Sequence, residues 1–225
     1  VFVFQSMKKA IRVFLVTLLA IAAVQAQSAR KLFKEADGYF EEKLYTQALD
    51  LYLQGLKSDP ENPKANFQAG ICYLETAYKE KSLPYLKKAL QLKPDIHAQL
   101  LVFLGEAYQY NHQFPEAVKQ YEAFLKTVDR NEPVTAHVNR RIYECHNGTR
   151  YLKEPVKAKI DNIGSVINSK YADFAPVISA NEAVLVFTSR REGSVGGELT
   201  PDDNQFYEDM YITYKGNGTW TVPRN

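Results

Sequence analysis

Apolar and polar residues follow a helical period over residues 29–128, and the pattern itself repeats along the chain. Apolar residues spaced three and four apart predict helices, and a period near 34 residues predicts pairs of antiparallel helices. Four positions of the first segment return 34 residues later, and two of them return again after 35 more. These sets are Ala36, Tyr39, Gly55 and Pro60; Gly70, Tyr73, Ala89 and Pro94; and Gly105 and Tyr108.

The second helix of each predicted pair carries the same kinds of residue, except in the middle segment. The first and third segments share an aromatic–small–aromatic set: Tyr45, Ala48 and Tyr52, and Phe114, Ala117 and Tyr121. The middle segment has Ser82 and Leu86 in place of the alanine and the second aromatic. Small residues let two helices cross closely while aromatic side chains fill the groove beside them. The prolines end the second helices because proline lacks the amide donor.

These residues resemble the tetratricopeptide repeat, in three copies over residues 29–62, 63–96 and 98–130. A further helix over residues 134–151 is expected to cap the open end of the stack, as terminal units must. The resemblance implies an α-solenoid whose inner helices line a concave groove, suited to an extended peptide or a partner helix. For each single groove residue, however, the sequence favours a role in packing between repeats. By position, the groove residues are Phe33, Asp37, Phe40, Glu41, Phe67, Ile71, Leu74, Glu75, Val102, Glu106, Gln109 and Tyr110.

The helical period ends at residues 153–155, and short alternating or apolar runs follow. Such runs, separated by turn residues, predict strands. The predicted strands are residues 156–163, 183–189, 210–214 and 220–222, with a turn at 216–218. Residues 193–203 are rich in Gly, Asp and Pro and predict an exposed loop. Four strands of this length look like one blade of a β-propeller.

The stretch INSKYADFAPVISANEAVLVFTSRR, followed by DMYITYKGNGTWTVPRN, is similar to the PD40, or WD40-like, blade of Gram-negative envelope proteins. The matching residues are Asn168, Ser169, Tyr171, Asp173, Ala175, Pro176, Ser179, residues 185–187, Ser189, Arg190, Asp209, Tyr211 and Trp220. In the family that this arrangement resembles, tetratricopeptide repeats precede a PD40 propeller and often an OmpA-like peptidoglycan-binding domain. One branch of it includes components associated with type IX secretion.

The expected fold class is therefore α+β multidomain, with an α-solenoid of helix pairs followed by the first blade of a truncated propeller over residues 153–225. A propeller typically needs four or more blades, and the sequence supplies about one. We therefore expect the N-terminal fragment of a longer protein. No OmpA-like domain occurs in the sequence, so the resemblance implies peptidoglycan binding only for the longer protein.

The N-terminal residues have the three parts of a secretory signal. Lys8, Lys9 and Arg12 are basic, residues 13–24 are almost continuously apolar, and residues 24–26 offer small residues at a cleavage site. We predict cleavage after Ala26 and no stable membrane span afterwards, because twelve apolar residues are short for a helix that crosses a bilayer. An uncleaved anchor is the alternative. The expected location is the periplasm, in association with the outer membrane.

Composition adds little chemistry beyond this picture. The 225 residues are 45% hydrophobic and 24% charged, which predicts a globular protein. Loss of residues 1–26 removes three basic and no acidic side chains, so the net charge changes from +2 to −1. This balance argues against nucleic acid as a partner.

Neither catalytic nor metal-binding motifs occur in the sequence. The four histidines do not form a HExxH motif and have no zinc-ligand spacing with Cys72 or Cys145. Both cysteines are expected to be buried packing residues, too far apart to form a disulfide. A nucleophile elbow, a P-loop and a dinucleotide-binding fingerprint are also absent. We expect no catalytic residue, no cofactor and no metal site.

The function that these patterns favour is a non-catalytic periplasmic adaptor. It would bind envelope or secretion-system proteins through the repeat groove and the propeller. Two alternatives remain open at this point. One is the N-terminal part of a PD40-propeller peptidase whose catalytic domain lies beyond Asn225. The other is an OmpA-type structural protein that links to the cell wall.

Overall fold

The computed structural model describes residues 27–129, 132–201 and 203–225, so the predicted export signal lies outside the described residues. The chain divides into two compact units that meet between Val156 and Lys157, and each is described here by itself. Within the described part, no helix combines the length and the apolar character that a membrane crossing requires.

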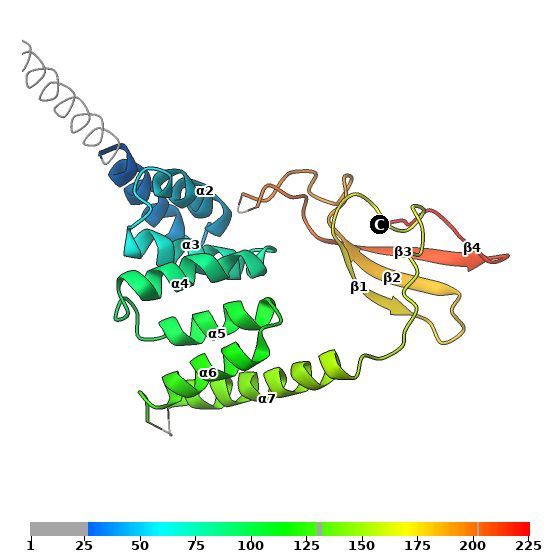
Figure 1. Cartoon of the computed structure of the whole chain (residues 1–225). Helices are drawn as coiled ribbons and strands as arrows, with labels where there is room; N and C mark the ends of the chain where they lie inside the picture. Colours follow the sequence, from blue (N-terminus) through cyan, green and yellow to red (C-terminus); the bar gives the residue numbers. More distant parts are fainter. Residues whose placement is uncertain (1–26, 130–131, 202) are drawn as a thin grey trace, which may run out of the picture. The chain divides into compact units, whose positions relative to one another are not determined.

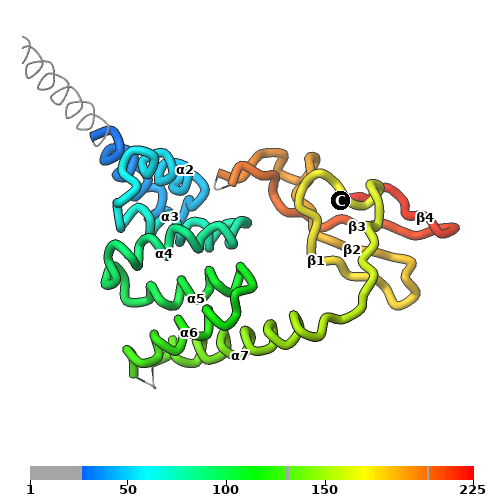
Figure 2. The backbone as a smooth tube through the Cα atoms, in the orientation of Figure 1, coloured from blue at the N-terminus to red at the C-terminus, as the bar shows by residue number. Residues whose placement is uncertain are grey.

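The first unit is an array of helices that stack in sequence order (Figure 1). Residues 27–41 are helical and form the first helix of the described part. The helices that follow are α2 (Tyr45–Leu56), α3 (Pro63–Glu75), the short 3₁₀ helix η1 (Lys79–Lys81), α4 (Ser82–Leu92), α5 (Leu100–Tyr110), α6 (Phe114–Leu125) and α7 (Pro133–Lys153). Each helix packs mainly against the one before and the one after it, and the backbone runs back and forth through the stack (Figure 2). This is a tetratricopeptide-like solenoid.

Local sequence signals explain where helix α3 begins. Asn62 is its N-cap and accepts a hydrogen bond from the Ala65 amide at 3.0 Å. Pro63 occupies the first helical position, where its fixed φ suits a helix and its missing N–H leaves no bond unmade. The Asn66 side chain donates to the carbonyl oxygens of Pro60 and Asn62, and so ties the incoming loop to the helix.

Glycines sit where the helices of a pair approach most closely. A Cβ atom placed on Gly70 would lie 2.6 Å from the Leu86 side chain on α4, and one on Gly105 would overlap the Tyr121 ring on α6. Leu86 and Tyr121 are completely buried. The small residues of the repeat therefore allow the close helix crossing that the spacing predicts.

Helix α7 packs on α6 and closes the array at its C-terminal end. Val138 and Cys145 of α7 join Tyr121 and Phe124 of α6 in one buried cluster. Cys72 and Cys145 are both buried and both free, as expected from the sequence.

The second unit is a four-stranded antiparallel sheet in the order β1-β2-β3-β4. Its strands are β1 (Asp173–Ile178), β2 (Val184–Ser189), β3 (Asp209–Gly216) and β4 (Thr219–Trp220). One face of the sheet forms a small core from Ile167, Leu185, Phe187 and Tyr211. The chain turns at residues 217–218 between β3 and β4.

Arg191 closes this small core at one end. Its guanidinium lies over the rings of Phe187 and Tyr211, 5.1 and 4.9 Å from their centroids. It also donates hydrogen bonds to Asp173 Oδ1 at 2.6 Å and to the Ile167 carbonyl oxygen at 2.8 Å. Burial raises the pKa of Asp173, but hydrogen bonds from Ser189, Ser169 and Arg191 outweigh it, so the pKa is lowered overall.

The prediction of a strand at residues 156–163 is wrong. These residues are irregular, and Val156 and Ile160 are almost fully exposed. The alternation of apolar and polar residues gives this segment one apolar edge, but no strand among the described residues pairs with it. The first strand is instead Asp173–Ile178, an edge strand with an irregular register between Phe174 and Val177. Pro176 is tolerated there because an edge strand can lack a donor.

Candidate protein-binding cleft

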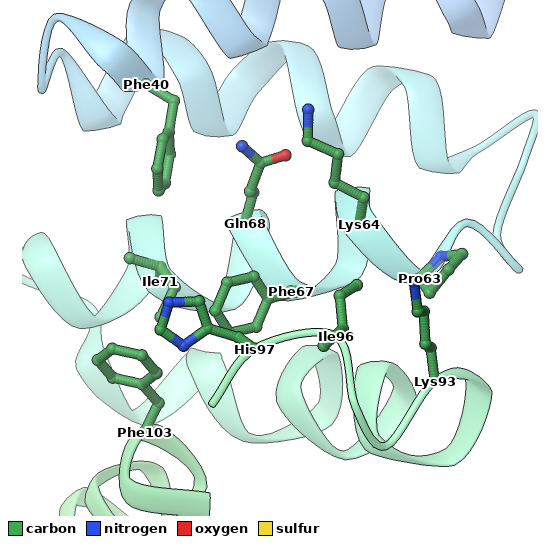
Figure 3. A pocket seen from close by; sticks show the side chains of 10 residues that line it. All are labelled: Phe40, Pro63, Lys64, Phe67, Gln68, Ile71, Lys93, Ile96, His97 and Phe103. Atoms are coloured by element: carbon green, nitrogen blue, oxygen red, sulfur yellow. The ribbon is translucent and has the colours of Figure 1, made fainter. Parts of the chain in front are cut away.

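An open cleft of about 470 Å³ crosses the inner helices of the array (Figure 3). Helix α3 forms its floor, the first helix contributes one wall, and the α4–α5 loop with the start of α5 contributes the other. The apolar lining residues are Phe40, Pro63, Phe67, Ile71, Ile96 and Phe103. The polar lining residues are Lys64, Gln68, Lys93 and His97.

An aromatic group forms the most apolar part of the cleft. The rings of Phe67 and His97 stack at 5.1 Å between centroids with an interplanar angle of 22°. Phe103 lies 6.0 Å from Phe67 and 5.6 Å from His97. The Gln99 amide donates a hydrogen bond to His97 Nδ1 at 3.1 Å, so the neutral ring carries its proton on Nε2. This ring is therefore fixed in orientation and can donate from its Nε2 atom.

Gln68 is the polar side chain with the greatest burial in the cleft. It lies on the same face of α3 as Lys64 and Phe67 and is only 9% exposed. Its Oε1 atom is buried without a hydrogen-bond partner. Figure 3 shows its side chain standing between those of Phe40 and Lys64. A buried acceptor left unpaired destabilises the folded state by about 1–3 kcal/mol, so this amide is a polar group that the fold leaves unsatisfied.

The two lysines of the cleft differ in their pairing. Lys64 Nζ lies 2.6 Å from Asp37 Oδ2 on the first helix, so its charge is already matched. Lys93 ends α4 and is exposed, and no ion pair involves it within the described residues. None of the described residues that line the cleft is acidic, so the unmatched charge in its lining is that of Lys93.

Differences between the repeats explain why the cleft lies at the middle one. The residue after the small position is Asp37 in the first repeat, Ile71 in the second and Glu106 in the third. The buried aromatic of the second helix is tyrosine in the outer repeats, but in the middle repeat Leu86 replaces it. The middle repeat therefore lacks both the acidic group and the phenol, and its inner surface is apolar.

In the first repeat, the acidic group and the phenol bind each other. Tyr52 Oη donates to Asp37 Oδ1 at 2.7 Å. Burial, the hydrogen bond to Asp37 and its negative charge raise the pKa of the Tyr52 phenol above its usual value. The phenol therefore acts as a fixed donor that orients Asp37.

In the third repeat, a polar network between α5 and α7 fills the corresponding surface. Tyr121 Oη donates to Gln109 Oε1 at 3.1 Å, and Gln109 Nε2 donates to Glu144 Oε2 at 3.4 Å. Arg141 lies between two carboxylates, 3.3 Å from Glu106 and 3.4 Å from Glu144. Burial raises the pKa of Glu144, but hydrogen bonds from Gln109 and Arg140 and the charge of Arg141 outweigh it and leave the pKa lowered.

The twelve groove residues named from the sequence therefore separate into several environments. Phe40, Phe67 and Ile71 line the cleft together. Asp37, Glu106 and Gln109 belong to the polar contacts just described. Phe33 packs over Gly55, and Leu74 and Val102 are buried in the core. Glu41 and Glu75 are exposed, and Tyr110 is exposed with the Lys79 ammonium 5.6 Å from its ring centroid.

Sequence reasoning missed several lining residues for a definable reason. The groove predicted on α3 includes Phe67, Ile71 and Leu74 and extends toward the end of the helix. The cleft lies one turn earlier, at Lys64 and Gln68. Residues 64, 67, 68 and 71 have the i, i+3, i+4, i+7 spacing of one helix face, and this signal was available. The contributions of Lys93, Ile96 and His97 come from the α4–α5 loop, whose path the repeat pattern does not specify.

Outside the cleft, the described residues offer little reactive chemistry. No group of three or more His, Cys, Asp or Glu side chains among them is placed to hold a metal ion. Burial raises the pKa of the Cys72 thiol to about 12 and that of Cys145 to about 11. Both thiols are therefore protonated near neutral pH and weak as nucleophiles.

Comparison with known proteins gives a distant curated relative and several similar structures. No protein-family model matches the chain. A protein STIP1 homolog from Dictyostelium discoideum is 27% identical over 151 residues, which are 67% of this chain and 26% of that protein. The chain thus spans about a quarter of the length of this curated relative.

Solved structures of TPR domains have a similar fold. The first TPR domain of human RPAP3 is 19% identical and aligns with a TM-score of 0.45, covering 58% of this chain and 99% of that domain. The first TPR of Spaghetti (RPAP3), bound to the HSP90 peptide SRMEEVD, is 22% identical with a TM-score of 0.42, covering 56% of this chain and 95% of that one.

Proposed function

We propose that the helical unit is the binding part of a non-catalytic adaptor that holds a short extended segment of a partner protein in the cleft. The observation that supports this most directly is the open, mainly apolar cleft around Phe67 and Phe103. Its volume falls within the range of about 300–1,000 Å³ that is usual for ligand pockets. Such a space accommodates a short piece of chain rather than a folded domain.

The proposal extends to the sheet, which we assign to a PD40-type propeller blade. Its second face supports this assignment, because the apolar side chains of Val177, Met210 and Tyr214 are largely exposed on it. A sheet with apolar residues on both faces is suited to packing between two further layers. The PD40 resemblance of residues 167–191 and 209–225 supplies the second argument.

We further propose that the protein is exported to the periplasm and takes part in organisation of the outer membrane or in secretion. The basic, apolar and small-residue parts of residues 8–26 support export. Mass spectrometry of the protein isolated from its own cells tests this directly. We expect a mature N-terminus at Gln27, and an intact N-terminus in the cytosolic fraction would contradict it.

The binding proposal is tested by site-specific photocross-linking in living cells. Benzoylphenylalanine in place of Ile96, at the cleft, should give a discrete adduct with a protein partner. The same group in place of the exposed Tyr143 on α7 is the matched control and should give none. Phe103→Glu should abolish the adduct at Ile96 without loss of the helical circular dichroism signal. An adduct that persists in the folded Phe103→Glu protein would mean that the partner does not bind on the apolar surface of the cleft.

A further inference from the structure

The chain contains the triplet Asn-Gly-Thr twice, in two different environments. Residues 147–149 lie inside helix α7, and residues 217–219 form the turn from β3 into β4. In an Asn-Gly pair the glycine nitrogen can attack the side-chain carbonyl carbon of the asparagine, because glycine has no Cβ to block the approach. Since the two triplets are identical, the fold around each one decides how readily this reaction occurs.

The turn at Asn217 and Gly218 leaves this reaction open. The φ angles are +51° at Asn217 and +80° at Gly218, as a two-residue type I′ hairpin turn requires. Both residues are exposed, and a Cβ placed on Gly218 would meet no atom within 4 Å. Within the part of the chain that the structure describes, neither the Asn217 side chain nor the Gly218 amide forms a hydrogen bond. The peptide group between them can therefore rotate until the glycine nitrogen reaches the asparagine side chain.

Helix α7 blocks the same reaction at Asn147. The Gly148 amide lies inside the helix, where it donates to the carbonyl oxygen four residues earlier. The Thr149 hydroxyl donates to the Cys145 carbonyl oxygen at 2.9 Å. A Cβ on Gly148 would lie 2.5 Å from the Phe114 ring, so the backbone is also packed against α6. Rotation of this peptide group would break the helix locally, and the helix therefore protects Asn147.

We propose that Asn217 is a site of spontaneous deamidation, and that its isoaspartate product detaches residues 219–225 from β3. The Gly218 nitrogen loses its proton to hydroxide and forms a bond to the Asn217 side-chain carbonyl carbon. The bond from this carbon to Nδ2 breaks, and ammonia leaves with a proton taken from water, which regenerates the hydroxide. Water then opens the cyclic imide at one of its two carbonyl carbons and yields aspartate or isoaspartate. The reaction transfers no electrons, and water is its co-reactant.

The two products differ in their effect on the hairpin. Aspartate keeps the length of the backbone, and Asp-Gly also suits a type I′ turn. In isoaspartate the backbone runs through the side-chain methylene, so the turn is one carbon longer and no longer sets the register of the two strands. That register aligns Gly216 with Thr219 and Lys215 with Trp220.

A few backbone hydrogen bonds hold the C-terminal segment against β3. The Thr221 amide donates to the Tyr214 carbonyl oxygen at 2.8 Å, and Ile212 and Arg224 exchange two hydrogen bonds at 2.8 and 2.9 Å. Strand β4 itself has only two residues. Because this short pairing depends on the turn, isoaspartate in the turn should release it, while the longer pairing of β2 with β3 remains.

Peptide mapping by mass spectrometry tests the site, after the folded protein is incubated at mildly alkaline pH. Trypsin yields GNGTWTVPR, which contains Asn217, and IYECHNGTR, which contains Asn147. Relative to the unincubated protein, we expect conversion of amide to acid to be about tenfold faster at Asn217 than at Asn147, because the helix must open locally before it reacts. In urea the two rates should become similar. Equal rates in the folded protein would overturn the inference, and so would an Asn217 that stays intact in the folded protein while the unfolded chain reacts.

Hydrogen exchange tests the structural consequence. The form that carries isoaspartate in the turn, identified by electron-transfer fragmentation, should lose protection at the Thr221 and Arg224 amides and keep it in β2. Asn217→Gly is the matched control: Gly-Gly suits the same turn but has no side-chain amide to lose, so protection should persist after the same incubation. Full protection of both amides in the isoaspartate form would contradict the release of the strand. Partner binding in the cleft enters none of these measurements, so the proposed function is tested separately.

Discussion

The middle repeat and the third repeat share a helical pattern but present opposite inner surfaces. Around the middle repeat, Ile71 and Phe67 leave an open apolar cleft. Around the third, the equivalent Glu106 is covered by Arg141 of α7 and joined to a polar network. The first repeat is intermediate, because Asp37 pairs with Lys64 at the border of the cleft.

This contrast shows that the small and aromatic positions of a repeat specify helix packing, whereas one or two variable positions decide what the packed surface can bind. Leu86 and Ile71 in the middle repeat correspond to Tyr52 and Asp37 in the first. Two replacements of polar by apolar residues thus distinguish an inner surface whose polar groups bind each other from one that is open and apolar. Five predictions probe this difference, from the largest expected effect to the smallest.

The largest effect is expected for Leu86→Ala in the middle repeat. Leu86 is completely buried and packs against Gly70 across the helix pair. Removal of a buried leucine side chain leaves a cavity and costs about 2–5 kcal/mol. Urea unfolding should therefore show a loss near 3 kcal/mol, whereas Leu152→Ala, an exposed position at the end of α7, should change little.

A smaller loss is expected for Arg141→Met, which leaves Glu106 and Glu144 without their shared cation. Because these side chains are partly exposed, we expect a loss of about 2 kcal/mol, below the 3–5 kcal/mol of a fully buried pair. Arg140→Met, at a mostly exposed position, is the control and should cost less than about 0.5 kcal/mol.

The same variant should also change the response to acid. The pKa of Glu144 is lowered in the folded protein, so its stabilising contribution is complete above the unfolded-state pKa of about 4.3. It is lost as the pH falls through the lower folded-state pKa. The difference between Arg141→Met and the parent should therefore shrink below about pH 4. A constant difference between pH 7 and pH 3 would mean that packing of the arginine stem, not its charge, is responsible.

The two buried tyrosines should differ from each other. Tyr52→Phe removes a hydrogen bond to the carboxylate of Asp37, and bonds to charged groups contribute about 1.5–3 kcal/mol. Tyr121→Phe removes a bond to the neutral amide of Gln109, for which about 1 kcal/mol is typical. Chemical unfolding of the two variants should rank Tyr52→Phe as the more destabilised. The reverse order would show that the network around Arg141 depends on the phenol of Tyr121.

The smallest effect, opposite in sign, is expected for Gln68→Met. Replacement of an unpaired buried amide by an apolar side chain of similar length should raise the free energy of unfolding by about 1 kcal/mol. Gln54→Met, at an exposed position on α2, gives the baseline for the same exchange outside the cleft. A loss of stability for Gln68→Met would mean that the Gln68 amide is satisfied in the free protein.

The sequence was sufficient for the helical unit but not for the site. The recurrence of Gly70 and Gly105 against bulky partners predicts close helix pairs, because only a few side chains permit that approach. The position of the cleft depends on the loop that carries His97 and on the burial of Gln68, and neither follows from a repeat period. For the sheet, the alternating residues 156–163 indicated a strand that does not form, since alternation shows a capacity for pairing but supplies no partner.

The arrangement of the cleft across successive helix pairs has a consequence for how the array unfolds. Each helix packs mainly against its immediate neighbours, and repeat arrays of this kind open one unit at a time. The cleft, however, is lined from the first helix, α3 and the beginning of α5. An occupant would contact all three repeats, so repeats that otherwise open one after another would open together. Amide protons in α2 and α4 should then become protected from exchange together when the cleft is filled.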